Sequence, residues 1–199
     1  MKKSEDKINY FVHPAAICES SDIGSETRIW AFVHILKNAR IGSECNICDY
    51  CFIENDVVIG NRVTVKNGIS VWDGITIEDD VFLGPHCVLT NDLFPRSKAY
   101  HSENVRTLIK QGASIGANAT IICGIILGRY CMVGAGAVVT KNVPDFALVT
   151  GNPARFKYWV SKTGEKLNFD IDNFAADSKG NRYKFTKGTE NSPEHVVEL

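Results

Sequence analysis

Three polar residues recur at one spacing in the first half of the chain: Asn55, Asp73 and Asn91 are separated by 18 positions each. A carboxylate between two amides can accept hydrogen bonds from an amine or a hydroxyl group and orient it for reaction. If 18 residues make one turn of the fold, these side chains lie above one another, and Asn91 is the last before a segment that does not repeat. Asn and Asp are also favoured at tight corners, so the spacing alone is compatible with a site or with turn residues.

A second column consists of residues with almost no side chain: Gly116 and Ala117 recur 18 positions later as Gly134 and Ala135. A thin, extended ligand such as a pantetheine arm can lie against backbone there and bond to its N–H and C=O groups. The cations that could meet the phosphates of coenzyme A are Lys110, Lys141 and Arg155. The alternative is that the small residues only satisfy the geometry of a turn.

Both columns depend on a repeat with a period of six residues. Every sixth residue is aliphatic from Ile17 to Leu89, and the series resumes from Ile109 to Val139. Asn, Asp and Gly gather one or two residues after the aliphatic, where they can adopt the positive φ of a corner. Six residues fit a short strand and a corner, so three such units close one coil. The pattern predicts an all-β parallel β-helix, a hexapeptide-repeat prism of about six coils.

The repeat divides the chain into a lead-in over residues 1–14, a β-helix over 15–144 and a C-terminal segment with a polar tail over 145–199. Residues 92–108 break the register and are predicted to form a long inserted loop, which is uncommon in a strict repeat unless it is functional. In the C-terminal segment we expect a short helix over 153–162, a short strand over 181–188 and a loosely packed tail.

Composition excludes several classes of protein. The 199 residues carry a net charge of −1 and a hydrophobic share of 44%, which is ordinary for a soluble globular protein. A near-neutral chain lacks the basic face that favours duplex nucleic acid, so no nucleic-acid partner is expected. The sequence contains no apolar run of about 18 residues and no apolar signal region, so we expect a cytoplasmic protein with no membrane partner.

The cysteines suggest a metal site that the register argues against. Cys45, Cys48 and Cys51 spell CxxCxxC, a spacing compatible with zinc or an iron–sulfur cluster. The repeat instead places Cys45 and Cys51 at small inward positions, which Cys87 and Cys131 also occupy, and free Cys packs there as a small apolar residue. We therefore expect buried, reduced thiols and no metal.

Histidines offer no better metal site. A zinc centre needs converging imidazoles, and the candidates are His34, His86 and His101. None of these three lie 18 residues apart, so the repeat does not place them above one another.

Five longer segments resemble those of a known enzyme family. They are TRIWAFVHI (27–35), NGISVWDGITIEDDVFLGP (67–85), TNDLFPRSK (90–98), KQGASIGANATIICG (110–124) and VPDFALVTGNPAR (143–155). They are similar to the hexapeptide-repeat N-acetyltransferases that act on nucleotide-linked 3-amino sugars for surface polysaccharides and S-layer glycans. The combination of VWDG with TNDLFPRSK most resembles the branch that uses dTDP-3-amino-3,6-dideoxyhexoses. The resemblance implies a left-handed β-helix.

The resemblance also implies roles for the two columns. In this branch a carboxylate of VW[D/E]G and the Asn-Asp of TND surround the sugar's amino group, and the matching positions are Asp73, Asn91 and Asp92. It implies acetyl-CoA as co-substrate along the glycine strip, and a homotrimer with active sites between neighbouring subunits. The further substrate-binding candidates are Asn55, Arg96 for the pyrophosphate, His34 for the sugar pocket, His86 as a lining or turn residue, and Trp72 or Phe94 for the base.

One departure from related enzymes bears on the reaction. Many hexapeptide-repeat acyltransferases that act on hydroxyl groups place a catalytic His near this loop as general base, whereas TNDLFP has none. An unprotonated amine needs no such base, so we expect N-acylation by direct attack of the amine on the thioester. Asp73 and Asn91 would orient the amine, and a backbone N–H would stabilise the oxyanion.

Two alternatives stay open at this point. The first keeps the chemistry and changes the acceptor to a UDP-linked 2-acetamido-3-amino-glucuronic acid, whose carboxylate would need an extra cation such as Arg28 or Lys37. The second is a trimeric β-helix scaffold without catalytic activity.

Overall fold

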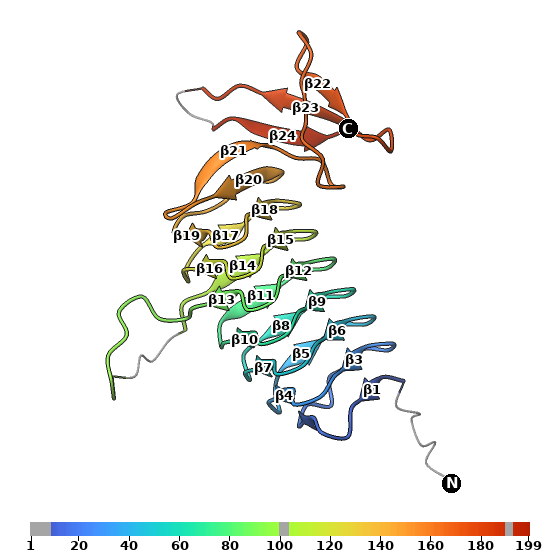
Figure 1. Cartoon of the computed structure of the whole chain (residues 1–199), viewed down its shortest axis with the longest axis vertical. Coiled ribbons are helices and arrows are strands. Elements are labelled where there is room, and N and C mark those ends of the chain that lie inside the picture. Colours follow the sequence, from blue (N-terminus) through green and yellow to red (C-terminus); the bar gives the residue numbers. More distant parts are fainter. Residues whose placement is uncertain (1–8, 100–103, 190–192) are drawn as a thin grey trace.

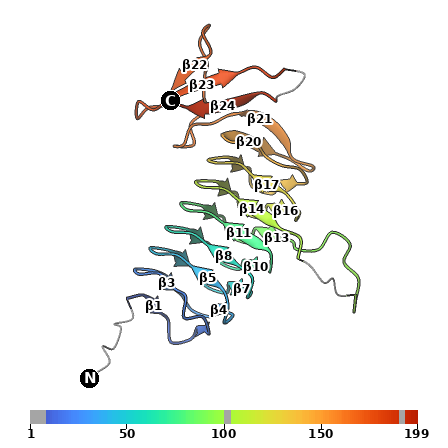
Figure 2. The ribbon, with the colours of Figure 1, turned by 180° about the vertical axis from the view of Figure 1, so that it is seen from behind.

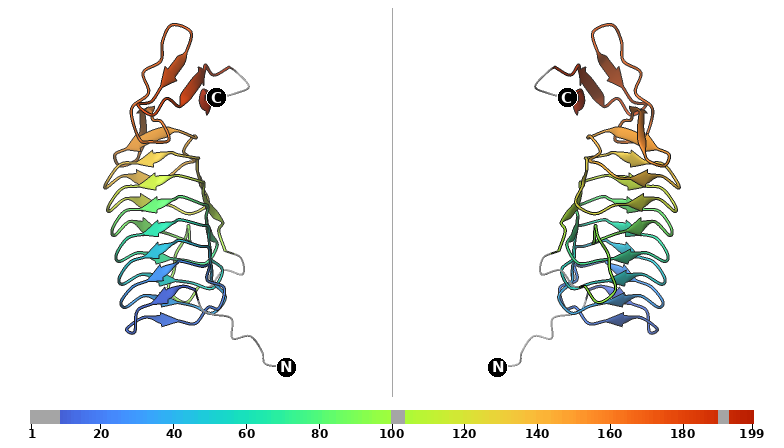
Figure 3. Two further views of the ribbon diagram at one scale, coloured as in Figure 1. Left: turned by 90° about the vertical axis from the view of Figure 1, so that its right-hand side faces the viewer. Right: turned by 90° about the vertical axis from the view of Figure 1, so that its left-hand side faces the viewer.

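The main body of the molecule is a prism of stacked coils, seen from the side in Figure 3. The computed structural model describes residues 9–99, 104–189 and 193–199. Short strands alternate with turns throughout the prism, and a small antiparallel sheet lies at its C-terminal end (Figure 1). The predicted all-β parallel β-helix is confirmed. His101, a zinc candidate above, lies outside the described residues.

The coils contribute short segments to three faces, and neighbouring strands within a face pair in parallel, with a break in one of the faces. Face 1 consists of β1 (Phe11–Val12), β3 (Arg28–Ile29), β6 (Asn46–Ile47), β9 (Thr64–Val65), β12 (Phe82–Leu83), β15 (Ser114–Ile115), β18 (Met132–Val133) and β20 (Ala147–Thr150). Face 2 consists of β2 (Ile17–Cys18), β4 (His34–Ile35), β7 (Phe52–Ile53), β10 (Ser70–Val71), β13 (Val88–Leu89), β16 (Thr120–Ile121) and β19 (Val138–Val139). Face 3 consists of β5 (Arg40–Ile41), β8 (Val58–Ile59), β11 (Ile75–Ile77), β14 (Thr107–Ile109) and β17 (Ile126–Leu127), which Figure 2 labels from behind.

The aliphatic column fills the axis of the prism. Ile29 pairs with Ile47 and Ile35 with Ile53, one coil apart, and all four side chains are fully buried. The small residues predicted to share the interior, such as Val33, are buried as well. Burial of each large aliphatic contributes roughly 1.5–3 kcal/mol to folding, so the coils are stabilised by their neighbours, as expected for a solenoid.

The first coil departs from the predicted register by one residue. Ile17, the first member of the predicted series, is 57% exposed, and Cys18 takes its inward place and pairs with Ile35. The described part of face 1 holds eight parallel strands, from β1 to β20, so the prism has about eight turns rather than about six. The first coil is shifted by one residue and the last turn is irregular. Neither has a complete six-residue pattern, so the sequence predicted too few coils.

The corner residues also differ from the expectation. Positive φ occurs one position later than the predicted Asn and Asp, at ordinary residues such as Phe32 (59°), Tyr50 (61°) and His86 (56°). The Asn and Asp side chains instead accept backbone hydrogen bonds from the neighbouring coil: Asn61 Oδ1 accepts from Ser43 N at 2.9 Å. These residue types are therefore used as caps for adjoining turns.

The C-terminal segment is more ordered than predicted. The segment predicted as a helix instead forms β21 (Arg155–Trp159), because antiparallel pairing with β20 supplies partners for its backbone N–H and C=O groups. The predicted tail contains a sheet of β22 (Phe174–Ala176), β23 (Arg182–Thr186) and β24 (His195–Glu198), and only the strand over 181–188 was anticipated. Its centre is Tyr183, which is fully buried. Within the described ranges, no helix is long and apolar enough to cross a membrane.

A buried carboxylate, that of Asp177, lies in the turn that joins β22 to β23. Asp177 accepts hydrogen bonds from the side chains of Asn181 at 2.7 Å and Tyr183 at 3.1 Å, and from two backbone N–H groups of its own turn. Burial acts to raise the pKa of Asp177, but the hydrogen bonds from Asn181 and Tyr183 favour the charged form, and the net pKa lies below its ordinary value.

Candidate active site

The three members of the polar column follow successive strands of face 2. Asn55 comes after β7, Asp73 after β10 and Asn91 after β13, all at the corner where the chain turns from face 2 to face 3. All three side chains are half-buried. The repeat therefore places them on one edge of the prism, and we call this edge the site corner.

Asp73 is held at two points by the coil below it. Its Oδ1 accepts a hydrogen bond from the backbone N–H of Asp56 at 2.6 Å, and its own backbone N–H donates to Glu54 Oε2 at 2.7 Å. Within the described residues, Oδ2 of Asp73 accepts no hydrogen bond. One carboxylate oxygen is thus fixed by the fold while the other is available to a ligand.

Asn55 and Asn91 differ although they share the column. Asn55 Oδ1 accepts a hydrogen bond from the backbone N–H of Asn38 at 3.1 Å, which makes it a turn cap like Asn61. The amide of Asn91 has no hydrogen-bond partner in the described part of the chain. Because this amide is half-buried, it can bond to water or to a ligand.

Face 2 is interrupted between Asp73 and Asn91. Its strands form two separate sheets, β10-β7-β4-β2 and β13-β16-β19, so β10 and β13 do not pair. On the other two faces the same coils stay paired, through β9 with β12 and β11 with β14. Backbone N–H and C=O groups are therefore released from the ladder beside the two candidate side chains, where they can bond to a polar ligand.

The inserted loop returns to the prism at the same place. Arg106 Nη1 lies 2.8 Å from Asp56 Oδ2, and Asn104 Nδ2 donates to the same oxygen at 3.4 Å. The backbone N–H of Thr107 then donates to the carbonyl of Gly74 at 3.1 Å. Sequence reasoning did not find these partners, because the loop's return depends on the fold and not on the repeat.

The outgoing half of the loop stands away from its own prism (Figures 1 and 2). Asp92 begins it with a turn in which Oδ1 accepts from the backbone N–H of Phe94 at 2.8 Å. Leu93 and Phe94 are 47% and 76% exposed. Arg96 is exposed and donates to the neighbouring Pro95 carbonyl, so its guanidinium is accessible to an anion.

Aromatic rings line the outer surface of face 2. His34 packs edge-on against Phe52 with ring centroids 5.6 Å apart, and Phe52 packs against Trp72 at 5.8 Å. His34 Nε2 also lies 2.8 Å from Glu19 Oε1. The structure brings His34 and Trp72 into one row through Phe52, which the sequence interpretation overlooked although it precedes an inward aliphatic.

His86 lies at the other edge of face 2. It occupies a corner position with φ 56°, and its ring covers Gly68, where an added Cβ would meet His86 Nδ1 at 2.4 Å. Of its two predicted roles, this geometry favours the turn residue.

The candidate coenzyme residues lie in three separate places. Gly116 and Gly134 lie where face 1 turns into face 2, and a Cβ on Gly116 would meet the backbone N of Ala135 at 2.4 Å. Close packing of coils thus accounts for the glycine without a ligand, and Ala117 is half-buried beside it. Lys141 and Arg155 both line one cavity of about 300 Å³ near the end of face 2. Lys110 lies on a different edge, after β14, and does not join them.

The four cysteines predicted to point inward are packed inside, whereas Cys18 is half-buried. All seven are free thiols, and the four assigned to inward positions are buried. Burial raises the pKa of the Cys51 thiol to about 11 and those of Cys87 and Cys131 to about 12. In the described residues no group of His, Cys, Asp and Glu is arranged to hold a metal ion.

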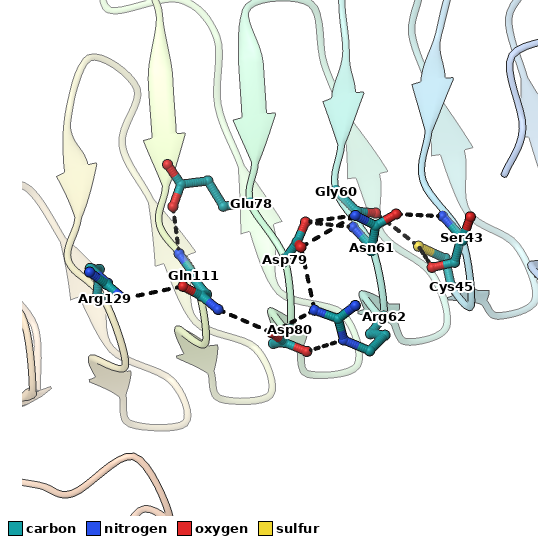
Figure 4. Close-up of polar contacts among 10 residues, drawn as sticks. All are labelled: Ser43, Cys45, Gly60, Asn61, Arg62, Glu78, Asp79, Asp80, Gln111 and Arg129. Carbon is teal, nitrogen blue, oxygen red and sulfur yellow. Dashed lines mark hydrogen bonds and ion pairs between the residues drawn. The ribbon is translucent and has the colours of Figure 1, made fainter.

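The edge between faces 3 and 1 carries a different polar ladder, drawn in Figure 4. Arg62 Nε donates to Asp80 Oδ1 at 2.7 Å, and Gln111 donates to Asp80 Oδ2 at 3.3 Å. The hydrogen bond from Arg62 holds the pKa of Asp80 below its ordinary value. Each of these groups has a protein partner, so this ladder joins coils and offers no free polar group comparable to Asn91.

Comparison with known proteins supports one family. A model described as bacterial transferase hexapeptide (six repeats) matches residues 106–141. The chain is 62% identical over 178 residues to a dTDP-3-amino-3,6-dideoxy-α-D-galactopyranose 3-N-acetyltransferase from Aneurinibacillus thermoaerophilus, covering 89% of this chain and 92% of that protein. A solved hexapeptide-repeat acetyltransferase from Vibrio cholerae, complexed with acetyl-coenzyme A, is 27% identical with a TM-score of 0.53, covering 59% of this chain and 69% of that one.

A second solved structure shares the fold at lower identity. The N-acyltransferase AntD from Bacillus cereus, in complex with dTDP and coenzyme A, is 19% identical with a TM-score of 0.53. The match covers 78% of this chain and 84% of that one. At this identity the likeness concerns the fold alone.

Proposed function

The chain belongs to the hexapeptide-repeat acetyltransferases, and on that premise we propose that it transfers the acetyl group of acetyl-CoA to the 3-amino group of a dTDP-linked 3-amino-3,6-dideoxyhexose. The observation that carries this function is the 62% identity to a 3-N-acetyltransferase across 178 residues, far beyond the span of the repeat model. That relative acts on the galacto-configured sugar, so the galacto compound is the first acceptor to test.

The site corner supports an amine acceptor. Among the described residues, Asp73 Oδ2 and the carbonyl oxygen of Asn91 accept no hydrogen bond, and both can accept hydrogen bonds from an amine. These bonds turn the nitrogen lone pair toward the thioester carbonyl carbon. The new C–N bond forms, the C–S bond breaks, and coenzyme A leaves as the thiolate. The amine proton passes to Asp73, to solvent or to the thiolate.

The donor's groove is proposed along the end of face 2. Lys141 and Arg155 share one cavity, and two exposed cations suit the phosphates of coenzyme A. The pantetheine arm would follow the edge that carries Gly116 and Gly134. The backbone N–H groups along this edge are the candidates for stabilising the oxyanion.

Acceptor binding would use the loop and the aromatic row. Arg96 has a solvent-accessible guanidinium that can pair with the pyrophosphate. The row that joins His34 to Trp72 offers ring faces and edges to the sugar or the base.

The assembly is proposed to be a homotrimer in the cytoplasm, with each site shared between neighbouring subunits. Leu93 and Phe94 support this, because an exposed apolar pair on a projecting loop is best explained by contact with another copy. The free thiols fit a reducing compartment. Gel filtration with light scattering tests the trimer, and Phe94→Asp should shift it toward smaller species.

A turnover assay tests the activity. The protein is mixed with acetyl-CoA and either dTDP-3-amino-3,6-dideoxygalactose, its gluco epimer or the UDP-linked 3-amino sugar acid, and thiol release is followed. We expect turnover with a dTDP sugar. Turnover only with the UDP sugar acid would select that alternative, and no turnover with any amino sugar would contradict the function. A pH–rate profile of Asp73→Asn shows whether Asp73 is the proton acceptor.

A further inference from the structure

One carboxylate joins the inserted loop to the site corner. The side chain of Asp56 receives Arg106 and Asn104 from the returning half of the loop, at 2.8 Å and 3.4 Å. The backbone N–H of the same residue donates to Asp73 Oδ1 at 2.6 Å. Asp56 therefore contacts the loop through its side chain and Asp73 through its backbone.

The contact between loop and corner is close at the residue after Asp73. Gly74 has φ 89°, and a Cβ there would lie 2.9 Å from the Val105 carbonyl oxygen and 3.0 Å from Asn104 Cβ. Its backbone N–H donates to the carbonyl of Asp56 at 3.0 Å. The loop's return, Gly74 and Asp56 thus pack as one unit, and a displacement of the loop is transmitted to the peptide that carries Asp73.

We propose that Asp56 is a positioning residue for acetyl transfer, which through its pair with Arg106 fixes the loop's return and thereby the orientation of Asp73. This inference rests on the proposed function. Asp56 itself uses one side-chain oxygen for the loop, and its role is to hold Asp73 Oδ2 in place and not to bind substrate.

The exposure of the ion pair between Arg106 and Asp56 separates an effect on the reaction rate from an effect on folding stability. The side chains of Arg106 and Asp56 are 67% and 42% exposed, and an exposed ion pair contributes little to the stability of a fold. A carboxylate that must meet a reacting amine is more sensitive, because a misplacement of about 1 Å can cost about a hundredfold in rate. Loss of the pair should therefore lower the rate without unfolding the protein.

The chain provides a matched control on another edge. Arg62 and Asp80 form a similar pair at 2.7 Å with side chains 45% and 35% exposed, on the edge between faces 3 and 1 (Figure 4). Asp80→Asn removes a charge of the same kind without touching the loop or the site corner. It should leave kcat and both KM values as in the wild type.

The test is a mutant cycle on the full-length protein. Asp56→Asn, Arg106→Gln and the double variant are assayed with acetyl-CoA and the amino sugar that the wild type uses, and their melting temperatures are measured. We expect each single variant to lose about tenfold in kcat, with the KM for acetyl-CoA unchanged. The double variant should lose no more than either single variant, because both changes remove one pair. In an Asp73→Asn background, Asp56→Asn should cause no further loss.

Several results would overturn the inference. It fails if Asp56→Asn keeps kcat within twofold of the wild type, if the losses from Asp56 and Arg106 add, or if Asp80→Asn loses as much rate. A general rise in both KM values together with a lower melting temperature would indicate a structural role only. These failures occur in a protein that turns over, whereas an inactive wild type would defeat the proposed function and this inference together.

Discussion

The variant Asn91→Ala best distinguishes a residue that contacts the substrate from a residue that only caps a turn at a corner of the prism. Asn91 shares its column with Asn55, yet its amide has no hydrogen-bond partner in the described part of the chain, so Asn91→Ala removes no hydrogen bond between the described residues. A half-buried substitution of this kind should change the free energy of unfolding by less than about 0.5 kcal/mol. If Asn91 accepts a hydrogen bond from the amine in the transition state, its loss costs about 1.5–3 kcal/mol. Each tenfold change in rate corresponds to roughly 1.4 kcal/mol of activation free energy, so kcat/KM should fall by between about tenfold and a hundredfold.

The matched variant is Asn61→Ala, which should behave in the opposite way. Asn61 Oδ1 accepts from the backbone N–H of Ser43 at 2.9 Å on an edge away from the site corner, so its loss leaves that donor without its partner. We expect about 1 kcal/mol of lost stability and a melting temperature roughly 2–4 °C lower, with kcat/KM unchanged. Thiol release and thermal melting by circular dichroism measure both quantities. If Asn91→Ala loses stability and keeps its kcat/KM within twofold, Asn91 is a corner residue and the site assignment is wrong.

Three further predictions concern the interior, the thiols and acid stability. Ile53 is fully buried, so Ile53→Ala should cost about 2–5 kcal/mol, measured as a lower urea midpoint, and an unchanged midpoint would mean that the axis is not tightly packed. The buried, raised-pKa thiols of Cys51, Cys87 and Cys131 should resist a disulfide reagent at pH 8 until denaturant is added, and rapid labelling of the native protein would contradict their inward placement. Since Asp177 has a pKa below its ordinary value of 3.8, its contribution to stability is present above that pH and is lost as the pH falls through the lowered value. The difference in melting temperature between wild type and Asp177→Asn should therefore shrink below about pH 4, and a difference that stays constant to pH 2 would refute this.

The periodic part of the fold could be predicted from the sequence because each coil must bury aliphatic side chains at the same positions. Ile35 and Ile53 had to be inward once the period was six, and both are fully buried. The prediction for Ile17 was wrong because β2 is the end strand of its sheet in the described structure, so only β4 constrains its register, and Cys18 takes the inward place. The C-terminal sheet has no repeat at all, and its centre, Tyr183, depends on pairing between strands that the sequence alone does not specify.

The candidate site was predictable in position but not in detail. The 18-residue spacing placed Asp73 and Asn91 on one edge, and it treated Asn55 as their equal. Only the three-dimensional structure shows that Asn55 caps a turn, whereas the Asn91 amide bonds to none of the residues that the structure describes. The pair between Asp56 and Arg106 was beyond sequence reasoning, because it joins residues 50 positions apart through a loop of irregular length.

The most direct test of the central claim is identification of the product. Mass spectrometry and NMR of a reaction containing acetyl-CoA and dTDP-3-amino-3,6-dideoxygalactose should show one acetyl group on the nitrogen at C3, formed by the wild type and strongly reduced in the Asp73→Asn and Asn91→Ala variants. Acetylation at a hydroxyl group, or an unmodified sugar nucleotide after long incubation with folded wild-type protein, would contradict the account.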